Sequence, residues 1–99
     1  MTNINAVEMI ARLQSGEQLN LLDVRERIEY HTYNIGGKNI PLPGLKSNLT
    51  ELKWNKTDEI IVICKAGIRS ATAKSILELD GYQNIRNLTG GLLAYQRNQ

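Results

Sequence analysis

The chain has 99 residues, of which 41% are hydrophobic and 22% charged, proportions that are ordinary for a small globular protein with one hydrophobic core. Twelve Lys and Arg stand against ten Asp and Glu, and this net charge of +2, without a basic cluster, gives no reason to expect a nucleic-acid or membrane partner. A single cysteine excludes an internal disulfide, and one cysteine with one histidine is too few for a zinc site.

The amino-terminal residues lack the positive charge and the long apolar run of a signal peptide, and no apolar run of the chain approaches membrane length. We therefore expect a cytoplasmic protein, unless a signal peptide has already been removed from this sequence. The length favours a single domain over residues 1–99, and no internal repeat, low-complexity tract or linker interrupts it.

Apolar spacing predicts that helices and strands alternate along the first part of the chain. Asn5, followed three residues later by Glu8, has the spacing of a capping box, so a helix should begin there. Asp23 is expected near the carboxyl end of the first strand. The elements expected up to residue 58 are a helix at 5–15, a strand at 19–24, a short helix or turn at 25–33, a short strand at 38–41, a helix at 45–52 and a turn at 56–58.

The second part of the chain begins with a central strand at 60–63, where four consecutive apolar residues indicate burial on both faces. The next helix should begin at Ser70 and end before Gly81, which lies where a left-handed residue is expected. A strand at 83–88, a tight turn at 90–91 and a helix at 92–97 should follow. This alternation predicts an α/β protein with right-handed crossovers around one buried, mainly parallel sheet.

The loop that joins the central strand to the next helix contains the only cysteine, Cys64. Unpaired N–H groups and the positive end of the helix dipole favour the thiolate, which is the reactive form of a cysteine. Lys65 and Arg69 add positive charge, and Gly67 allows the loop to curl so that its amides point inward. The sequence therefore predicts an anion-binding loop around a nucleophilic thiol.

Each residue of this loop also has an ordinary structural interpretation. A lone cysteine after an apolar strand is most often a small buried hydrophobe. Lys65 would then be a solvated lysine, and Arg69 would form a salt bridge across the loop. Ser70 either offers its hydroxyl to the sulfur or caps the helix, and we prefer the cap. The combination favours a functional loop, because packing alone does not require two cations there.

Asp23 and Arg25 are expected at the same rim as the loop, because ligands of open parallel sheets gather at the carboxyl ends of the strands. We expect them to support the rim rather than to react, since such ion pairs are often structural. His31, the only histidine, is expected in a surface turn and receives no catalytic role.

Four segments, taken in order, have the character of family motifs: Leu21-Leu22-Asp23-Val24-Arg25-Glu26 with Glu29-Tyr30, Gly36-Gly37 with Asn39-Ile40-Pro41-Leu42, Cys64-Lys65-Ala66-Gly67-Ile68-Arg69-Ser70, and Leu88-Thr89-Gly90-Gly91-Leu92-Leu93-Ala94-Tyr95. Together they resemble the single-domain rhodanese-like sulfurtransferases over nearly the whole chain. The resemblance implies a three-layer domain whose central, mainly parallel sheet is flanked by helices on both faces.

The resemblance also implies a reaction. The cysteine of the loop would attack the outer sulfur of a sulfane donor such as thiosulfate, hold that sulfur as a persulfide and pass it to a thiophilic acceptor, cyanide in the laboratory. A desulfurase or a sulfur-acceptor protein would be the natural partner, and no cofactor or metal is expected. The implied roles are nucleophile for Cys64, donor binding for Lys65, Ala66, Gly67, Ile68, Arg69 and Ser70, and support for Asp23 and Arg25.

The sequence departs from the family pattern at two places. Asn34 stands where the family often has a histidine, and the stretch 34–39 is one residue shorter than the common pattern. No catalytic role can therefore be transferred to His31. Tyr95 replaces a frequent tryptophan, a change that concerns packing.

Two other classes of protein remain open. Phosphatases and arsenate reductases also use a loop from cysteine to arginine at a helix start, but usually with five residues between them, whereas four separate Cys64 from Arg69. The shorter ring suits a single sulfur atom better than phosphate. A non-catalytic module, in which Cys64 is a redox-responsive thiol or a carrier that needs a partner, is the other alternative.

Overall fold

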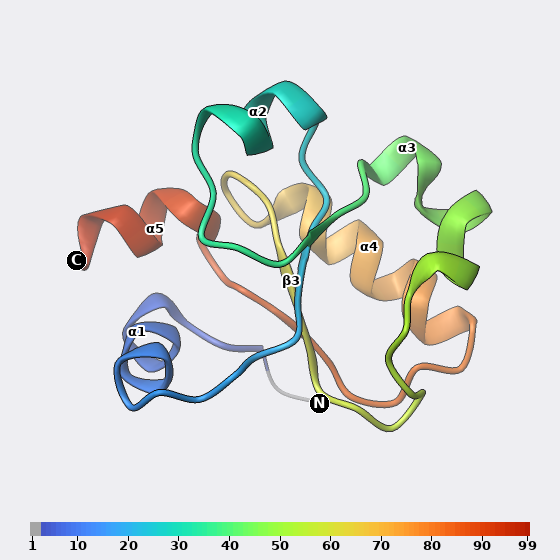
Figure 1. Ribbon diagram of the computed structural model, residues 1–99, viewed down its shortest axis with the longest axis horizontal. Helices are drawn as coiled ribbons and strands as arrows, with labels where there is room; N and C mark the ends of the chain where they lie inside the picture. Colours follow the sequence, from blue (N-terminus) through green and yellow to red (C-terminus); the bar gives the residue numbers. More distant parts are fainter. Residues whose placement is uncertain (1–2) are drawn as a thin grey trace.

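Residues 3–99 are described by the computed structural model, and over this range the chain forms a four-stranded sheet (Figure 1). The strands are parallel and lie in the order β2-β1-β3-β4. Their bounds are β1 Leu21–Asp23, β2 Lys38–Asn39, β3 Ile60–Ile63 and β4 Ile85–Asn87. The expectation of a parallel α/β sheet with its central strand at 60–63 is confirmed.

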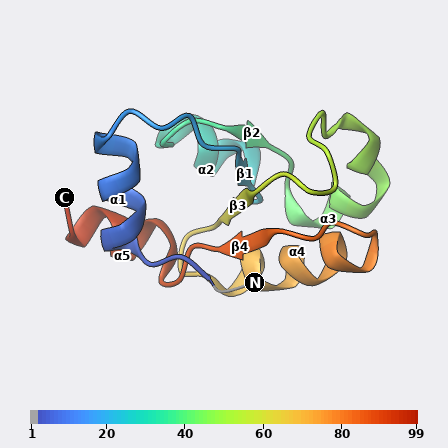
Figure 2. The same cartoon turned by 90° about the horizontal axis from the view of Figure 1, so that it is seen from below.

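Helices cover both faces of the sheet (Figure 2). The first and last helices pack on one face, while the helices before and after β3 pack on the other. The short helix α2 lies at the rim where the strands end. The helices are α1 Ala6–Gln14, α2 Arg27–Thr32, α3 Leu42–Leu45, the 3-10 segment η1 Lys46–Glu51, α4 Ile68–Leu79 and α5 Gly91–Arg97. The predicted three-layer architecture is therefore confirmed.

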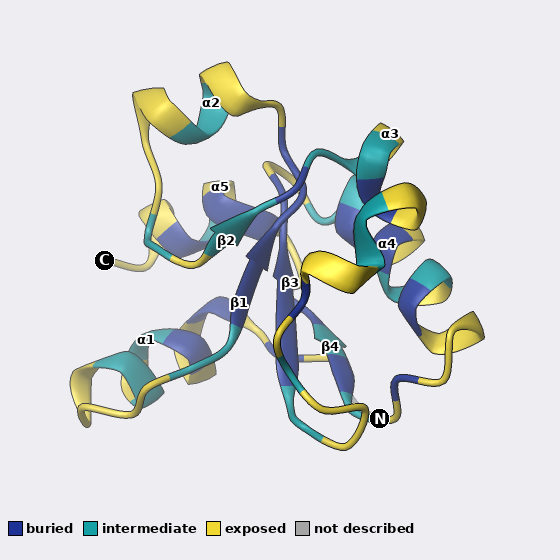
Figure 3. Ribbon diagram, turned by 45° about the vertical axis from the view of Figure 1, so that its right-hand side comes forward, coloured by how far each residue is buried: buried dark blue, intermediate teal, exposed yellow. Residues whose placement is uncertain are grey.

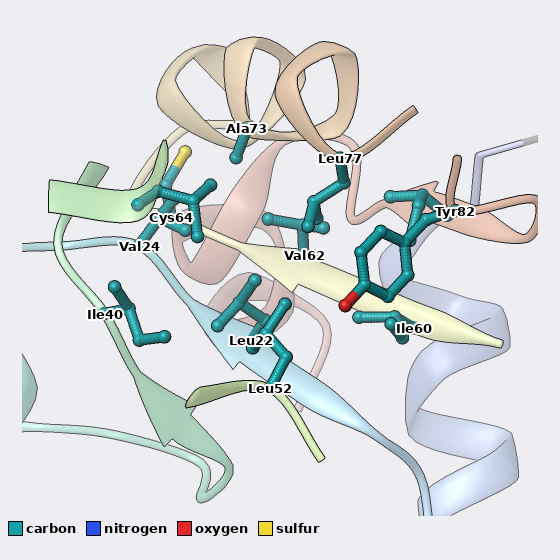
Figure 4. Close-up of a cluster of buried hydrophobic side chains, with 12 residues drawn as sticks. Leu22, Val24, Ile40, Leu52, Ile60, Val62, Cys64, Ala73, Leu77 and Tyr82 are labelled. Carbon is teal, nitrogen blue, oxygen red and sulfur yellow. The ribbon is translucent and has the colours of Figure 1, made fainter. Parts of the chain in front are cut away.

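Burial along β3 explains why its sequence is apolar without interruption. Ile60 and Val62 face the α3 and α4 side, whereas Ile61 and Ile63 face the α1 and α5 side, and all four side chains are inaccessible to solvent (Figure 3). Alternate residues of a strand point to opposite faces, so a strand between two helical layers needs an apolar residue at every position. Figure 4 shows the cluster on the α4 side, with Cys64 at its end.

The helix expected at 45–52 is wrong as a single helix. The structure has instead the short helix α3, which ends at Leu45, and the 3-10 segment η1, in which Asn48 has non-helical dihedral angles. The Asn48 side chain donates a hydrogen bond to the Gly44 carbonyl at 2.7 Å, which satisfies a backbone group that a continuing helix would have paired. Leu45 and Leu52 are both buried, so the spacing of the leucines reflected packing rather than one helix.

Two helix ends can be compared with the expectations directly. Asn5 is the N-cap of α1 and accepts a hydrogen bond from the Glu8 N–H at 2.8 Å, but the Glu8 carboxylate bonds to Arg86 of β4. Gly81 has a φ of +95°, as expected for the left-handed residue after α4. No helix within residues 3–99 has the length and apolar character needed to cross a bilayer.

Candidate active site

The loop after β3 turns sharply at Gly67 before α4 begins. Gly67 has a φ of +94° and is the N-cap of α4, whose first residue is Ile68. Glycine is required there because the left-handed conformation penalises other residues and because an added Cβ would lie 3.1 Å from the Gly90 nitrogen. The helix thus starts two residues earlier than expected, directly beside the cysteine.

The Cys64 sulfur lies inside this turn. Its Sγ accepts backbone N–H groups from Gly67 at 3.0 Å and from Ser70 at 3.3 Å, and the Ser70 hydroxyl lies 3.2 Å away. Cys64 is only 1% exposed. The loop therefore brings together the thiol and inward-pointing amides, the arrangement that favours an anionic sulfur.

The environment of Cys64 perturbs its ionisation in two directions. Burial raises the pKa of the thiol, because it disfavours the charged form. Hydrogen bonds from the amides of Ser70, Gly67 and Ala66 lower the pKa, and the net shift is downward. The pKa of Cys64 is consequently lower than that of an ordinary cysteine.

The carbonyl side of the loop is held by the start of α5. The Leu92 and Leu93 N–H groups donate to the carbonyls of Cys64 and Lys65, each at 3.0 Å. A Cβ on Gly91 would lie 2.5 Å from the Cys64 carbonyl oxygen, so only glycine allows this approach. The glycines expected to form a tight turn therefore also bring α5 against the loop that contains Cys64.

Ser70 does not cap α4, and the preference for a cap is wrong. It is the third residue of the helix, fully buried, with its hydroxyl directed at Cys64 and at the Asn87 side chain. Asn87 also donates from Nδ2 to the Gly67 carbonyl at 3.1 Å. Sequence reasoning missed Asn87, although its place at the carboxyl end of a strand beside β3 put it at the rim where ligands gather.

Arg69 forms the salt bridge that was considered as its structural alternative. Its guanidinium contacts both carboxylate oxygens of Glu29 in α2, at 2.7 and 3.0 Å. The hydrogen bond from Arg69 lowers the pKa of Glu29 to about 2, and the pKa of Arg69 is raised in turn. Glu29 was part of a motif but received no role from the sequence. The pair ties α2 to the first turn of α4.

Asp23 and Arg25 lie together at the rim, as expected. Asp23 is fully buried, and its carboxylate accepts from the Arg25 guanidinium at 2.8 Å and from the Arg25 N–H at 3.0 Å. The Arg25 guanidinium also donates to the carbonyl of Glu29 within α2 and to that of Tyr33 at the C-cap of this helix. This buried pair thus connects β1 to α2, and its part in any reaction stays a prediction.

An open pocket of about 340 Å³ lies between α2 and α5, next to the loop. Lys65 lines it and is exposed, and its ammonium group has no hydrogen-bond or ion-pair partner within residues 3–99. Ala66 and Ile68 are also exposed, whereas Cys64 does not line the pocket. The remaining lining residues are Arg25, Ile28, Glu29, Thr32, Tyr33, Leu92, Leu93 and Gln96.

The fold and the loop together define an α/β protein with a cysteine cradled at the carboxyl edge of a parallel sheet. The chain belongs to the rhodanese-like domain family, whose pattern matches residues 5–98.

Individual relatives agree with this family. The thiosulfate sulfurtransferase PspE of Escherichia coli is 38% identical over 72 residues, which are 72% of this chain and 68% of PspE. YrkF of Bacillus subtilis, a proposed sulfur carrier protein, is 38% identical over 82 residues, 82% of this chain. The human single-domain sulfurtransferase TSTD1 superposes with a TM-score of 0.83 at 27% identity, covering 98% of this chain and 96% of TSTD1. The chain spans less than half of several curated relatives, including 43% of YrkF.

Proposed function

We propose that this chain is a sulfurtransferase that moves a sulfane sulfur from a donor such as thiosulfate to a thiophilic acceptor through a persulfide on Cys64. The observation that carries the proposal is the Cys64 sulfur, which accepts two backbone N–H groups at the start of α4 and has a lowered pKa. Similarity to PspE supports thiosulfate as a donor.

In the first half-reaction, the Cys64 thiolate attacks the outer sulfur of thiosulfate. A sulfur–sulfur bond forms to Sγ, the bond between the two thiosulfate sulfurs breaks, and sulfite leaves with the electron pair of that bond. The product persulfide carries the negative charge that the thiolate had. Because the thiolate is already favoured by the loop amides, no general base is needed.

In the second half-reaction, an acceptor such as cyanide attacks the terminal sulfur of the persulfide. Thiocyanate leaves, and the electron pair of the broken sulfur–sulfur bond returns to Sγ as thiolate. The charge and the sulfur count balance in each step. In the cell, a desulfurase or a sulfur-acceptor protein would replace the small reagents. We propose that the protein acts in the cytoplasm.

The residues of the loop have distinct roles in this proposal. Amides from Lys65 to Ser70, including those of Ala66, Gly67 and Ile68, would stabilise the anionic terminal sulfur. Lys65 would attract the anionic donor, because its ammonium group is exposed and unpaired within the described residues. Arg69 is neutralised by Glu29, so its charge would contribute less to donor binding than its position in the sequence suggested.

A partner-dependent sulfur carrier is the second candidate. Two observations support it. Cys64 is only 1% exposed, which hinders the approach of small reagents to its sulfur, and the chain is similar to YrkF. An oxyanion enzyme has less support, because only four residues separate Cys64 from Arg69 and the arginine is engaged with Glu29. Phosphate chemistry would need that guanidinium to face the loop.

The first experiment is the intact mass of the reduced protein after incubation with thiosulfate and then with cyanide, with a Cys64→Ser variant alongside. We expect the native protein to gain one sulfur atom and to lose it on addition of cyanide, and the variant to stay unchanged. Sulfur transfer by a folded Cys64→Ser variant would refute the assignment of the nucleophile. An unmodified native protein whose thiol still titrates would favour the carrier, and a phosphatase assay would follow.

A further inference from the structure

The Ser70 hydroxyl lies between two groups that can both accept its proton. Its oxygen is 3.2 Å from the Cys64 sulfur and is hydrogen bonded to Oδ1 of Asn87. A serine hydroxyl has a single proton to donate. Whether that proton points at the sulfur or at the amide decides whether Ser70 stabilises the thiolate or the thiol.

The orientation of the Asn87 amide resolves this question. Its Nδ2 donates to the Gly67 carbonyl at 3.1 Å, and a carbonyl oxygen can only accept. The amide therefore cannot be turned around without placing two oxygens against each other, and Oδ1 must face Ser70. Ser70 and Asn87 are both buried, with 0% and 6% exposure, so water does not replace the bond. The Ser70 proton consequently belongs to Asn87.

We propose that Asn87 is a positioning residue that holds the Ser70 proton away from Cys64. The Ser70 oxygen then presents a lone pair to the sulfur and accepts a hydrogen bond from the Cys64 thiol. Asn87 thereby favours the protonated thiol in the resting protein, against the loop amides that favour the thiolate. The inference deepens the proposed function and rests on Cys64 being its nucleophile.

Once Cys64 is ionised, its thiolate and Oδ1 of Asn87 compete for the proton of the Ser70 hydroxyl. The hydroxyl can turn its proton to the thiolate only by leaving Oδ1 of Asn87 as a buried acceptor without a donor, which is costly. Without Asn87 the same hydroxyl would be free to donate to the thiolate. The Asn87 side chain therefore sets how much of the thiol is ionised at neutral pH.

The charged groups around Cys64 are the same in the variants that test this idea. Arg69 interacts electrostatically with Cys64 and is paired with Glu29. Lys65 is the next residue in the chain, and the nearby Asp23 is paired with Arg25. Since Asn87 and Ser70 are neutral, their replacement by neutral residues changes hydrogen bonds without changing the charge of the site.

The test is a titration of the Cys64 thiolate by its ultraviolet absorbance as a function of pH, in protein without thiosulfate. The chain has one cysteine and four tyrosines, which also gain ultraviolet absorbance on ionisation, so the signal of a Cys64→Ser variant is subtracted to isolate that of Cys64. We compare the native protein, Asn87→Leu, Ser70→Ala and the double variant, each checked for folding by circular dichroism. We expect about tenfold more thiolate at neutral pH in Asn87→Leu, the change that one hydrogen bond to a charged sulfur would bring.

The two orientations of the Ser70 proton predict different changes in the Cys64 titration midpoint of the Ser70→Ala variant. If Ser70 accepts from the thiol, its removal leaves the titration midpoint unchanged or lower. If Ser70 donates to the thiolate, its removal raises the midpoint, and the proposal is overturned. This variant decides the question by itself should Asn87→Leu fail to fold.

The double variant separates an effect through Ser70 from an effect through the loop. The proposal expects Asn87→Leu to change nothing in the Ser70→Ala background. A shift of the same size in both backgrounds would mean that Asn87 acts through the Gly67 carbonyl, and would overturn the proposal. Because the titration needs no sulfur donor, a native protein that transfers no sulfur would refute the proposed function and leave this result standing.

Discussion

The ion pair between Glu29 and Arg69 should stabilise the fold at neutral pH, and replacing Glu29 should remove that stabilisation. Replacing Glu29 by Gln removes the charge but keeps an oxygen that can accept the Glu26 N–H, which Glu29 accepts at 2.9 Å in the capping box of α2. A pKa of about 2 instead of 4.5 would correspond to about 3 kcal/mol if the carboxylate were shielded from water. The two side chains are 35% and 30% exposed, so solvent screening reduces this, and we expect a coupling energy of about 1 kcal/mol.

The pH dependence of this coupling follows from the direction of the shift. The pKa of Glu29 is lowered by folding, so its contribution to stability is fully present above the unfolded pKa of about 4.5. It is lost as the pH falls from 4.5 through about 2, and about half or less should remain at pH 3.

The assay is a double-mutant cycle of Glu29→Gln and Arg69→Gln, with unfolding free energies from urea titrations at pH 7 and pH 3. Glu26→Gln is the matched control, because the Glu26 carboxylate lies at the N-cap of the same helix, forms no salt bridge with Arg69 and has a weaker electrostatic effect on it than Glu29. A coupling energy that is the same at both pH values, or a loss in Glu26→Gln as large as in Glu29→Gln, would show that the reasoning about the pair is wrong.

Three further predictions concern Gly91 beside the loop, Lys65 within it and Asn5 at the start of α1. Gly91→Ala should destabilise the protein by about 2 kcal/mol more than Gly16→Ala. Both glycines have a positive φ, but only Gly91 of the two has backbone atoms 2.5 Å from the added Cβ. Equal losses of unfolding free energy in urea would contradict this. Lys65→Ala should lower kcat/KM for thiosulfate about threefold to tenfold at low salt and change the unfolding free energy by less than about 0.5 kcal/mol. Lys53 is also exposed, so Lys53→Ala is the control. An unchanged kcat/KM would mean that Lys65 does not contribute to donor binding. Asn5→Ala should cost about 1 kcal/mol in unfolding free energy through loss of the α1 cap, and a loss near zero would mean that water replaces it.

Much of the fold could be predicted because periodicity reports on burial. The uninterrupted apolar run at 60–63 fits a strand at the centre of a sheet covered on both faces. Gly81 has the left-handed conformation expected after a helix. The helix at 45–52 failed because leucine spacing does not register a side chain such as Asn48 that competes for backbone hydrogen bonds.

The site was predictable only where its residues are local in sequence. Cys64 and Gly67 could be found because a strand and a helix meet there, and the chemistry of that junction is general. Asn87 and Glu29 contact the loop from β4 and α2, and nothing in the spacing of residues 20 or 40 positions away reveals a hydrogen bond. The role of Ser70 was misjudged for the same reason, since its partner was not visible.

The contacts between residues 87–93 and the Cys64 loop bear on how the protein matures. Asn87, Leu92 and Leu93 donate hydrogen bonds to the carbonyls of Gly67, Cys64 and Lys65, so the surroundings of the thiol depend on residues that are synthesised after the loop itself. A chain synthesised only as far as the loop would carry Cys64 without these contacts, and the environment of the thiol would form only once residues 87–93 have folded against the loop. Folding of this later segment thus completes the environment of the thiol.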